Sequence, residues 1–370
     1  TAETGNAALF VTTGGSSGLP KAIVAYPGAT VTVGSTSIIG IRTAGSTGVN
    51  ADYWDFVGLR VLGAALAIGL SGTSIPSSDH WRIVDNYLSC PSGDGQSACL
   101  ETTLGAYIKV LGNEVTDAGC HETGATPCAW VDPPQTISSS GTSITLSGFT
   151  SGFTAPDTIR AQSQTRVVVS CSSATACIID SAFSPDLALG TNWEFRNYMP
   201  DKQYHSLYFS TDSNHIEVAW NNIHNNSSCR GIQFHSTPLS PTTGYNQYDL
   251  LVHDNVIHDQ TCNAINFATV DPSQGPVEAY NNVIYHTGIG PRPTGGESNY
   301  ACIYNADTTN KGTPGSGVVQ VYNNTFYDCA PHSISAGRDN GVVNDAGYNA
   351  GLTINLRNNA SQQLVGESYI

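Results

Sequence analysis

Apolar and polar residues alternate over short stretches of this chain, and many of these stretches end in asparagine. The template reads apolar, any, apolar, any, polar or small, asparagine, any, apolar. It fits NHIEVAWNNIHNN from Asn214, YDLLVHDNVIHDQ from Tyr248, VEAYNNVIYHTG from Val277, GVVQVYNNTFYDC from Gly317 and GLTINLRNNAS from Gly351, with weaker copies in HWRIVDNYLS and AYIKVLGNEV. A period of two predicts strands, and repetition predicts a solenoid with one coil per copy.

The asparagines of these copies form one column. Its members are Asn86, Asn113, Asn221, Asn255, Asn282, Asn324 and Asn359. If each copy is one coil, the asparagines stack at the strand spacing of roughly 4.8 Å, and their amides can hydrogen-bond along the stack. Asparagine also tolerates the left-handed conformation at a bend, so we expect each of them at an inward-facing turn.

A second repeated element follows the asparagine segments, in HSLYFSTD, RGIQFHST, NAINFATV, ACIYNADT and HSISAGRD. Alternation directs one set of side chains inward: Leu207, Ile232, Ile265, Ile303 and Ile334, then Phe209, Phe234, Phe267, Asn305 and Ala336. It directs another set outward: Tyr208, Gln233, Asn266, Tyr304 and Ser335, then Ser210, His235, Ala268, Ala306 and Gly337. The phenylalanine column is interpreted as core, and the outward set as a flat polar and aromatic face.

With these repeats, the chain resembles the right-handed parallel β-helix proteins of the pectate-lyase-like superfamily. The resemblance runs from AIVAYPGATVTVG, starting at Ala22, to LTINLRNN near the end. It implies an all-β fold, a three-sheet right-handed parallel β-helix with an asparagine ladder. The superfamily contains polysaccharide lyases, glycoside hydrolases, pectin esterases, epimerases and phage tailspikes, and no catalytic motif transfers to this chain residue by residue, so the activity must be inferred from the site.

One gap in the repeat predicts an insertion. Asn113 and Asn221 lie much further apart than other neighbours in the column, and the segment between them is rich in short strand runs and turn residues. We therefore expect N-terminal coils over residues 1–128, an inserted β lobe over 129–198 just before HSLYFSTD, and C-terminal coils of the same β-helix over 199–370. The lobe is either a decoration or a wall over a substrate face.

Charge and cysteine content narrow the class of protein. The formal net charge is −15, which disfavours nucleic acid as a partner and gives little long-range attraction for polyanionic glycans. No apolar run is long enough to span a membrane. The chain opens without a signal peptide and is interpreted as mature or trimmed. Ten cysteines without a C-x-x-C spacing favour disulfides over zinc, and hence a secreted, extracellular or periplasmic protein.

The cysteine positions predict five disulfides. Three pairs would close short loops, and Cys229 and Cys262 hold the same template position in adjacent coils, where the coil spacing suits a disulfide. The predicted pairs are Cys90 with Cys99, Cys120 with Cys128, Cys171 with Cys177, Cys229 with Cys262, and Cys302 with Cys329.

Three long turns, over residues 236–248, 289–300 and 306–317, flank the outward face and suggest a groove for a polymer. Equivalent carboxylates one coil apart approach the ~5 Å separation of retaining glycosidases, and two coils apart the ~6.5 to 9.5 Å of inverting ones. The candidate catalytic carboxylates are Glu101, Asp212, Asp271 and Asp307, with Asp339 at the far end. The alternative for each aspartate is a turn former that bonds its own backbone, whereas Glu101 holds an outward strand position.

An acid or base of another kind is His235, which has small neighbours on the outward face. A lyase also needs cations to neutralise a uronate carboxylate, with His235 or Tyr208 as base and Ca²⁺ as an optional helper held by the aspartates. The candidate cations are Arg230, Arg338, Arg292, Lys202 and Lys311. His205 and His332 open their strands at a coil corner, and His224 and His258 are interpreted as surface residues of another sheet.

Three hypotheses follow. The first is a secreted enzyme that hydrolyses glycosidic bonds of an extracellular polysaccharide with the carboxylates as acid and base. In it, sugar-binding residues would be Tyr208, Gln233, Asn266, Tyr304, Arg230 and Arg338, no cofactor is required, and no nucleic acid or membrane is a partner. The second is a lyase or epimerase on a uronic-acid polymer that uses His235 and arginines. The third is a non-catalytic module for glycan binding, adhesion or filaments; the chain is a monomer or associates end to end.

Overall fold

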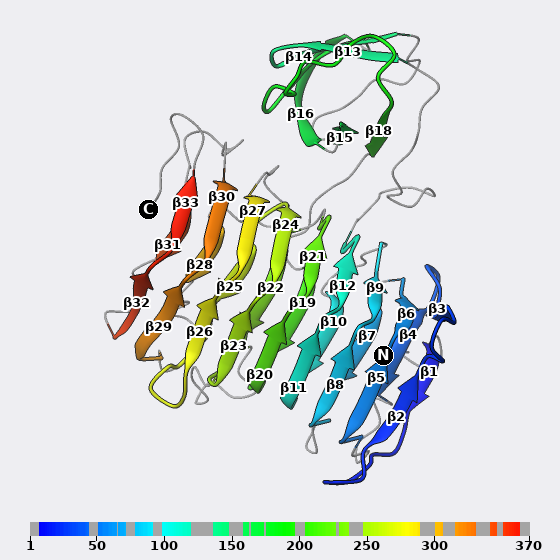
Figure 1. The fold of residues 1–370 in the computed structure, drawn as a ribbon, viewed down its shortest axis with the longest axis vertical. Coiled ribbons are helices and arrows are strands. Elements are labelled where there is room, and N and C mark those ends of the chain that lie inside the picture. Colours follow the sequence, from blue (N-terminus) through cyan, green and yellow to red (C-terminus); the bar gives the residue numbers. More distant parts are fainter. Residues whose placement is uncertain are drawn as a thin grey trace.

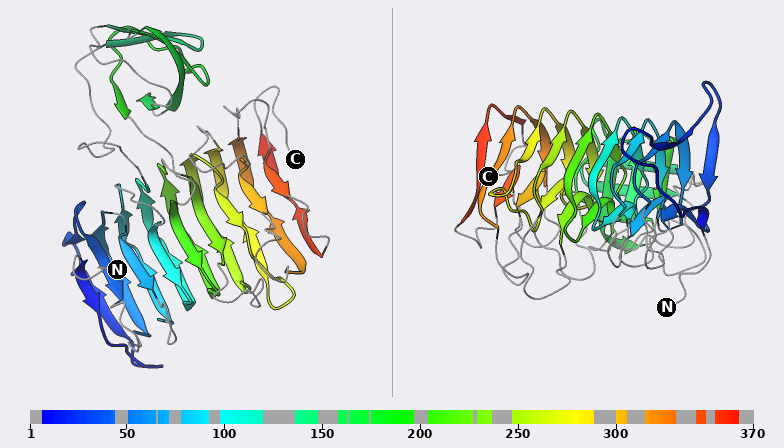
Figure 2. Two further views of the ribbon diagram at one scale, coloured as in Figure 1. Left: turned by 180° about the vertical axis from the view of Figure 1, so that it is seen from behind. Right: turned by 90° about the horizontal axis from the view of Figure 1, so that it is seen from below.

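Three nine-stranded parallel sheets wind into one β-helix (Figure 1). The computed structural model describes residues 7–43, 51–64, 66–71, 78–91, 98–119, 136–147, 158–162, 164–173, 175–196, 204–226, 229–236, 247–288, 300–305, 315–330, 341–345 and 351–362. The chain visits sheets 1, 2 and 3 in turn, and each strand pairs with the equivalent strand of the next coil. The coils therefore follow one another in sequence order, as the views in Figure 2 show.

Each sheet contains one strand from every coil. Sheet 1 consists of β1 (Ala7–Val11), β4 (Ile39–Thr43), β7 (Ile68–Ser71), β10 (Ala98–Thr103), β19 (His205–Ser210), β22 (Arg230–His235), β25 (Ile265–Phe267), β28 (Ile303–Asn305) and β31 (Val343–Asp345). Sheet 2 consists of β2 (Lys21–Val24), β5 (Trp54–Val57), β8 (Trp81–Val84), β11 (Ala106–Leu111), β20 (Asn214–Ala219), β23 (Leu250–His253), β26 (Val277–Tyr280), β29 (Gly317–Tyr322) and β32 (Leu352–Arg357). Sheet 3 consists of β3 (Val31–Gly34), β6 (Leu59–Leu62), β9 (Tyr87–Ser89), β12 (Glu114–Thr116), β21 (Asn222–His224), β24 (Val256–Gln260), β27 (Val283–Thr287), β30 (Thr325–Cys329) and β33 (Ala360–Gln362).

The predicted repeat corresponds to the passage from sheet 2 to sheet 3. The five strong copies form the pairs β20/β21, β23/β24, β26/β27, β29/β30 and β32/β33, and the two weak copies form β8/β9 and β11/β12. The first two described coils carry no ladder asparagine, and the first described strand begins at Ala7, earlier in the chain than Ala22. Leu59 occupies the ladder position of the second coil, where its backbone N–H donates to Asn86 Oδ1 at 2.9 Å.

The asparagine ladder is confirmed along its whole length. Nδ2 of each asparagine donates to Oδ1 of the next one, at 2.9 or 3.0 Å from Asn86 to Asn359. The second Nδ2 hydrogen of each donor reaches a backbone carbonyl of the preceding coil, as from Asn255 to Val218 at 2.9 Å. The sequence predicted a left-handed backbone at the asparagine itself. Instead, the residue before each asparagine is left-handed: the backbone φ is 59° at Trp220 and 54° at Asp254.

The core is formed by the inward columns. Phe209, Phe234 and Phe267 are fully buried and stacked, with ring centroids 5.1 and 5.5 Å apart. Ile303 pairs with Val343, so β31 supplies the next strand of sheet 1. The assignment of that strand to HSISAGRD, with Ile334 and Ala336 inside, was therefore wrong.

The insertion is a separate antiparallel sheet. It consists of β13 (Thr136–Ser140), β14 (Ser143–Ser147), β15 (Thr158–Ala161), β16 (Gln164–Ser173), β17 (Ala176–Ile179) and β18 (Trp193–Arg196), in the order β13-β14-β17-β16-β15-β18. Its own core includes Ile137, Phe183 and Trp193. The lobe enters the chain between β12 and β19, as expected. Its limits at 129 and 198 fall outside the described residues and stay a prediction.

Four of the predicted disulfides are present. They join Cys90 to Cys99, Cys171 to Cys177, Cys229 to Cys262 and Cys302 to Cys329. The Cys229–Cys262 pair links adjacent coils with a Cα separation of 4.5 Å. Cys120 and Cys128 lie outside the described residues. The disulfides are consistent with an extracellular location, and within the described ranges we find no helix that could cross a membrane.

A charged cluster at the end of sheet 3 gives a pH-dependent contribution to stability. Asp259 accepts hydrogen bonds from His286 Nδ1 at 2.5 Å and His258 Nδ1 at 2.8 Å. Burial opposes ionisation of Asp259, but the two imidazoles outweigh it and hold its pKa well below the usual value. Burial likewise opposes protonation of His286, but Asp259 outweighs it and raises the pKa of His286.

We expect Asp259→Asn to destabilise the protein most near pH 5, by about 1.5 to 3 kcal/mol. The carboxylate contribution is complete above its unfolded pKa of about 3.9 and is lost as the pH falls towards the depressed folded pKa. The imidazole contribution is complete below about 6.5 and is lost as the pH rises through the raised folded pKa of His286. Urea unfolding of both proteins between pH 3 and 9 measures the difference; a loss independent of pH would contradict this assignment.

Candidate active site

The outward face of sheet 1 carries the predicted row of polar side chains. Strand register places Glu101 of β10 beside Tyr208 of β19, then Gln233 of β22, Asn266 of β25 and Tyr304 of β28. On the other side, Glu101 adjoins Gly69 of β7. Alternation along the strands therefore gave the correct direction for these side chains, because their neighbours Leu207 and Phe209 point into the core.

Tyr208 and His235 are in contact on this face. His235 lies two residues further along β22 than Gln233, on the same face, in register with Ser210. The Tyr208 hydroxyl lies 3.2 Å from His235 Nδ1 and 3.4 Å from the His235 carbonyl oxygen. Both side chains are half-buried, as is Glu101. A phenol and an imidazole can each act as an acid or a base in catalysis. Here the two groups share a hydrogen bond, and part of each ring is accessible to solvent.

The surroundings keep the Tyr208 hydroxyl protonated. Burial raises its pKa most strongly, and the negative charge of Glu101 raises it further, while a hydrogen bond with Ser210 and the charge of Arg230 act in the opposite direction. The net effect is a pKa above the usual value for tyrosine. A phenol in this state is a proton donor, and loss of its proton requires a neighbouring acceptor such as His235.

His205 and Arg230 form the inner side of the cluster. They occupy equivalent positions at the start of β19 and β22, and the His205 ring meets Tyr208 edge-on at 5.0 Å. His205 is 3% exposed, and its Nδ1 has no hydrogen-bond partner within the described part of the chain. Burial, and then the charges of Arg230 and His235, lower the pKa of His205 well below its usual value. His205 is therefore neutral and adds no charge to the cluster.

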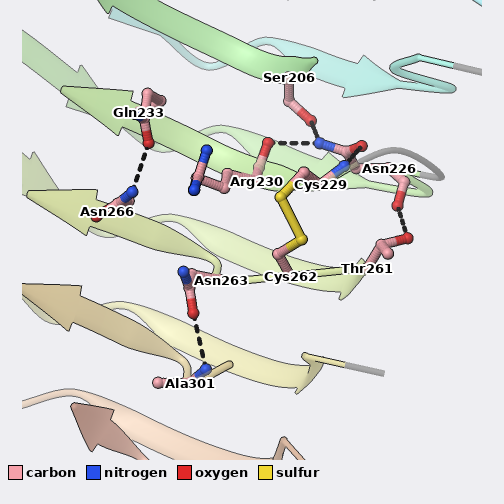
Figure 3. The surroundings of a disulfide bond; sticks show 10 residues. All are labelled: Ser206, Asn226, Cys229, Arg230, Gln233, Thr261, Cys262, Asn263, Asn266 and Ala301. Carbon is pink, nitrogen blue, oxygen red and sulfur yellow. Dashed lines mark hydrogen bonds between the residues drawn. A yellow bond between two sulfur atoms is a disulfide. The ribbon is translucent and has the colours of Figure 1, made fainter. Parts of the chain in front are cut away.

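The position of Arg230 is fixed by the corner between sheets 3 and 1. Arg230 directly follows Cys229, which is bonded to Cys262, and its carbonyl oxygen accepts a hydrogen bond from Asn226 Nδ2 at 2.5 Å. Figure 3 shows its side chain extending along β22 towards Gln233. Arg230 is only 9% exposed. A cation held in this way exerts a strong electrostatic effect, because few water molecules screen it.

The other predicted sugar contacts are nearly inaccessible. Gln233, Asn266 and Tyr304 are 4%, 1% and 5% exposed. Asn266 Nδ2 donates to Gln233 Oε1 at 2.6 Å, as Figure 3 shows, and Asn266 Oδ1 has no partner among the described residues. The direction of these side chains matches the prediction, but the expected open, flat face is largely covered.

Among the described carboxylates, Glu101 and Asp212 do not hold equivalent positions in neighbouring coils. Glu101 is in register with Tyr208, and Asp212 lies four residues further along the chain, in the turn after β19. Asp212 Oδ1 instead accepts a hydrogen bond from Ser236 Oγ at 3.2 Å.

Asp271 caps a turn. Its carboxylate accepts hydrogen bonds from Ser273 Oγ at 2.6 Å, Gln274 Nε2 at 2.6 Å and the Ser316 backbone N–H at 2.9 Å. Burial opposes ionisation, but these bonds outweigh it and keep the pKa of Asp271 below its usual value. This is the turn-forming role that the sequence left open as the alternative, and it disfavours Asp271 as a general acid.

Several predicted site residues lie outside the described residues. They are Asp307, Arg338, Asp339, Arg292, Lys202, Lys311 and His332. Most of the three long turns also falls there. The described residues contain no group of three or more His, Cys, Asp or Glu side chains that could hold a metal ion.

The sequence reasoning placed His205 only at the edge of the face. Its contact with Tyr208 is the feature that was missed, although one signal was present: His205 opens the strand that carries Tyr208. His224 and His258 belong to sheet 3, as expected, where their rings stack at 5.0 Å.

No protein-family model matches the chain, and no curated protein matches it. Among solved structures the chain is similar to the Dettilon tailspike protein gp208, with 13% sequence identity and a TM-score of 0.34 over 91% of this chain. The match covers 60% of the tailspike chain, so this chain spans less than two thirds of its length. A likeness of this extent carries no argument, and the chemistry must be inferred from the residues themselves.

Proposed function

We propose that the protein processes a polysaccharide and cleaves a uronic-acid glycan by β-elimination at the Tyr208–His235 pair. The observation that carries the proposal is the 3.2 Å contact between the Tyr208 hydroxyl and His235 Nδ1, beside Arg230 and Glu101. Hydrolysis by two carboxylates, our first hypothesis, has less support, because Glu101 adjoins Gly69 and Tyr208 in its row, and because Asp271 caps a turn.

The proposed reaction requires three groups. A base removes the proton from the carbon next to the uronate carboxylate, the adjacent carbon–oxygen bond breaks, a carbon–carbon double bond forms, and the leaving oxygen receives a proton. His235 accepts the first proton, because an imidazole is a base near neutral pH. Tyr208, which its raised pKa keeps protonated, donates the second.

Arg230 supplies the positive charge. Removal of the proton places negative charge on the carboxylate, and a guanidinium in a poorly hydrated position stabilises that charge more than it would in water. Two observations support this role: Arg230 is in register with His205, and its charge lowers the pKa of His205 and opposes the rise in the pKa of Tyr208. Neutral His205 holds the Tyr208 ring in position without weakening the field of Arg230.

The proposal is tested by incubating the protein with polygalacturonate, alginate and a panel of neutral polysaccharides. We expect new reducing ends together with the ultraviolet absorbance of an unsaturated uronate on one of the acidic polymers. Reducing ends without this absorbance would establish hydrolysis instead, and Glu101 would then be the candidate acid or base. Neither signal on the full panel, with folded protein, would overturn the enzymatic proposal in favour of a binding or structural role.

A further inference from the structure

Trp220 is an exposed aromatic residue at the corner between sheets 2 and 3, on a part of the molecule distinct from the candidate active site. It is 57% exposed and has a left-handed backbone, with a φ of 59°. The same corner position is also left-handed in seven other described coils, where it holds glycine, aspartate or asparagine: Gly58, Asp85, Gly112, Asp254, Asn281, Asn323 and Asn358. A bulky side chain is unfavourable in this conformation, and its exposure means that it adds little to the core.

The indole of Trp220 is not part of the face-to-face aromatic stack beside it. His253 stacks face to face on Tyr280, with centroids 4.6 Å apart and planes 6° apart. Trp220 meets His253 at 5.3 Å with an interplanar angle of 85°, so the two rings are perpendicular. Among the described residues, no ring stacks face to face on the indole.

The coil on the other side of Trp220 leaves open space. Gly112 occupies the equivalent corner, and a Cβ atom placed there would meet no atom within 4 Å. Exposed Tyr107 on the other edge of sheet 2 differs in this respect, because His80 and His215 cover its two faces at 4.6 and 4.2 Å. Trp220 thus offers a flat apolar surface with room beside it, and Tyr107 offers only a ring edge.

Polar groups suited to sugar hydroxyls lie on the strands of sheet 2 that lead to this corner, and one of them contacts His253, the ring beside the indole. Lys109 Nζ and Glu217 Oε2 form an ion pair at 2.6 Å, and Glu217 Oε1 lies 3.5 Å from His253 Nε2. Lys109 and Glu217 each lie three residues before the corner positions of their coils, Gly112 and Trp220. The Lys109 side chain is 51% exposed, so its ammonium group is accessible to a ligand.

We propose that Trp220 is the stacking platform of a second glycan-binding subsite, which takes a pyranose ring. The C–H face of a pyranose and the face of an indole both lose water on contact, and the Lys109–Glu217 pair supplies a donor and an acceptor for hydroxyl groups. This subsite is on the corner of sheets 2 and 3 and needs neither Tyr208 nor His235. The inference therefore stands or falls separately from the proposed elimination.

The test is calorimetric titration of the full chain with hexasaccharides of glucose, xylose, mannose, galacturonate and mannuronate. Trp220→Asn is the main variant, because asparagine already occupies this corner in Asn281 and Asn323. Gly112→Asn is the second variant. It places a side chain in the open space beside the indole, again with a residue that this corner already holds in other coils. We expect each to weaken the binding of at least one hexasaccharide about tenfold or more, also in a Tyr208→Phe background.

Tyr26→Ala is the matched control, since Tyr26 is an 80% exposed aromatic residue in the first coil and should not affect the affinity. Thermal unfolding checks that every variant is folded. Unchanged affinity in Trp220→Asn would overturn the proposal, and so would the absence of binding to all five hexasaccharides. If Tyr208→Phe by itself abolished binding, the ligand would be assigned to sheet 1, and the proposed subsite at Trp220 would likewise be overturned.

Discussion

Replacing Tyr208 with phenylalanine is expected to lower kcat on the cleaved uronate polymer by roughly 10² to 10⁴-fold. The change removes one oxygen atom, and with it the proton donor and the hydrogen bond to His235. The ring remains, so the edge-on contact with His205 and the packing of β19 are preserved. Initial rates of unsaturated-product formation, measured from pH 5 to 10, give the effect.

Tyr304→Phe is the matched control for this prediction. Tyr304 occupies the same outward row on β28 but lies three coils from Tyr208, away from His235 and Arg230. We expect it to retain nearly full activity. An equal loss in both variants would indicate damage to the sheet, and full activity in Tyr208→Phe would remove Tyr208 from the mechanism. His235→Gln should also remove the acidic limb from the pH profile of the residual activity, because the proposed base must be unprotonated to accept a proton.

Replacing Asn255 with alanine is expected to lower the free energy of unfolding by about 3 kcal/mol or more. Asn255 Oδ1 accepts hydrogen bonds from the backbone N–H and from Nδ2 of Asn221, at 3.0 and 2.9 Å. Its Nδ2 donates to Val218 and Asn282. Asn255 is 1% exposed, and each buried polar group that loses its partner costs about 1 to 3 kcal/mol. Urea unfolding followed by circular dichroism provides the measurement.

Asn359→Ala provides the comparison at the end of the ladder. Asn359 also accepts two hydrogen bonds from its neighbour Asn324 and donates to Val321, but it is only partly buried. Water can replace the missing partners there, so we expect a loss of about 1 kcal/mol. Equal losses at the two positions would show that burial does not set the strength of the ladder.

Much of the fold could be predicted because stacked coils repeat the same physical demands. Asparagine is unfavourable within strands, so its recurrence at one template position indicated the ladder, and alternation placed Phe209, Phe234 and Phe267 inside. The equivalence of Cys229 and Cys262 followed from the same register. The pattern was misleading where a coil lacks the asparagine or where another segment resembles the repeat. Leu59 holds the ladder position of an early coil. HSISAGRD resembles the sheet 1 element in sequence, but Val343 is the residue that pairs with Ile303.

The sequence predicted the direction of the side chains in the candidate site but not their burial or their hydrogen-bond partners. Alternation gives the face on which Tyr208, Gln233 and Asn266 lie, but it does not give their accessibility: Gln233 and Asn266 are only 4% and 1% exposed. The role of Asp271 likewise depends on Ser316, 45 residues further along the chain, which donates one of its hydrogen bonds. The contact between Tyr208 and His235 depends on the register of β19 and β22 and on the rotamers of both side chains. The repeat in the sequence predicts the register but not the rotamers.

The place of the lobe has a consequence for how such a chain can evolve. The ladder bond between Asn113 and Asn221 closes 108 residues, against 34 for the next bond between Asn221 and Asn255, and both have the same length of 2.9 Å. Since the entropy of loop closure grows only with the logarithm of length, the extra segment costs about 1 kcal/mol on that account. A coil corner can therefore gain, lose or exchange a whole module by recombination while the coils on either side keep their register.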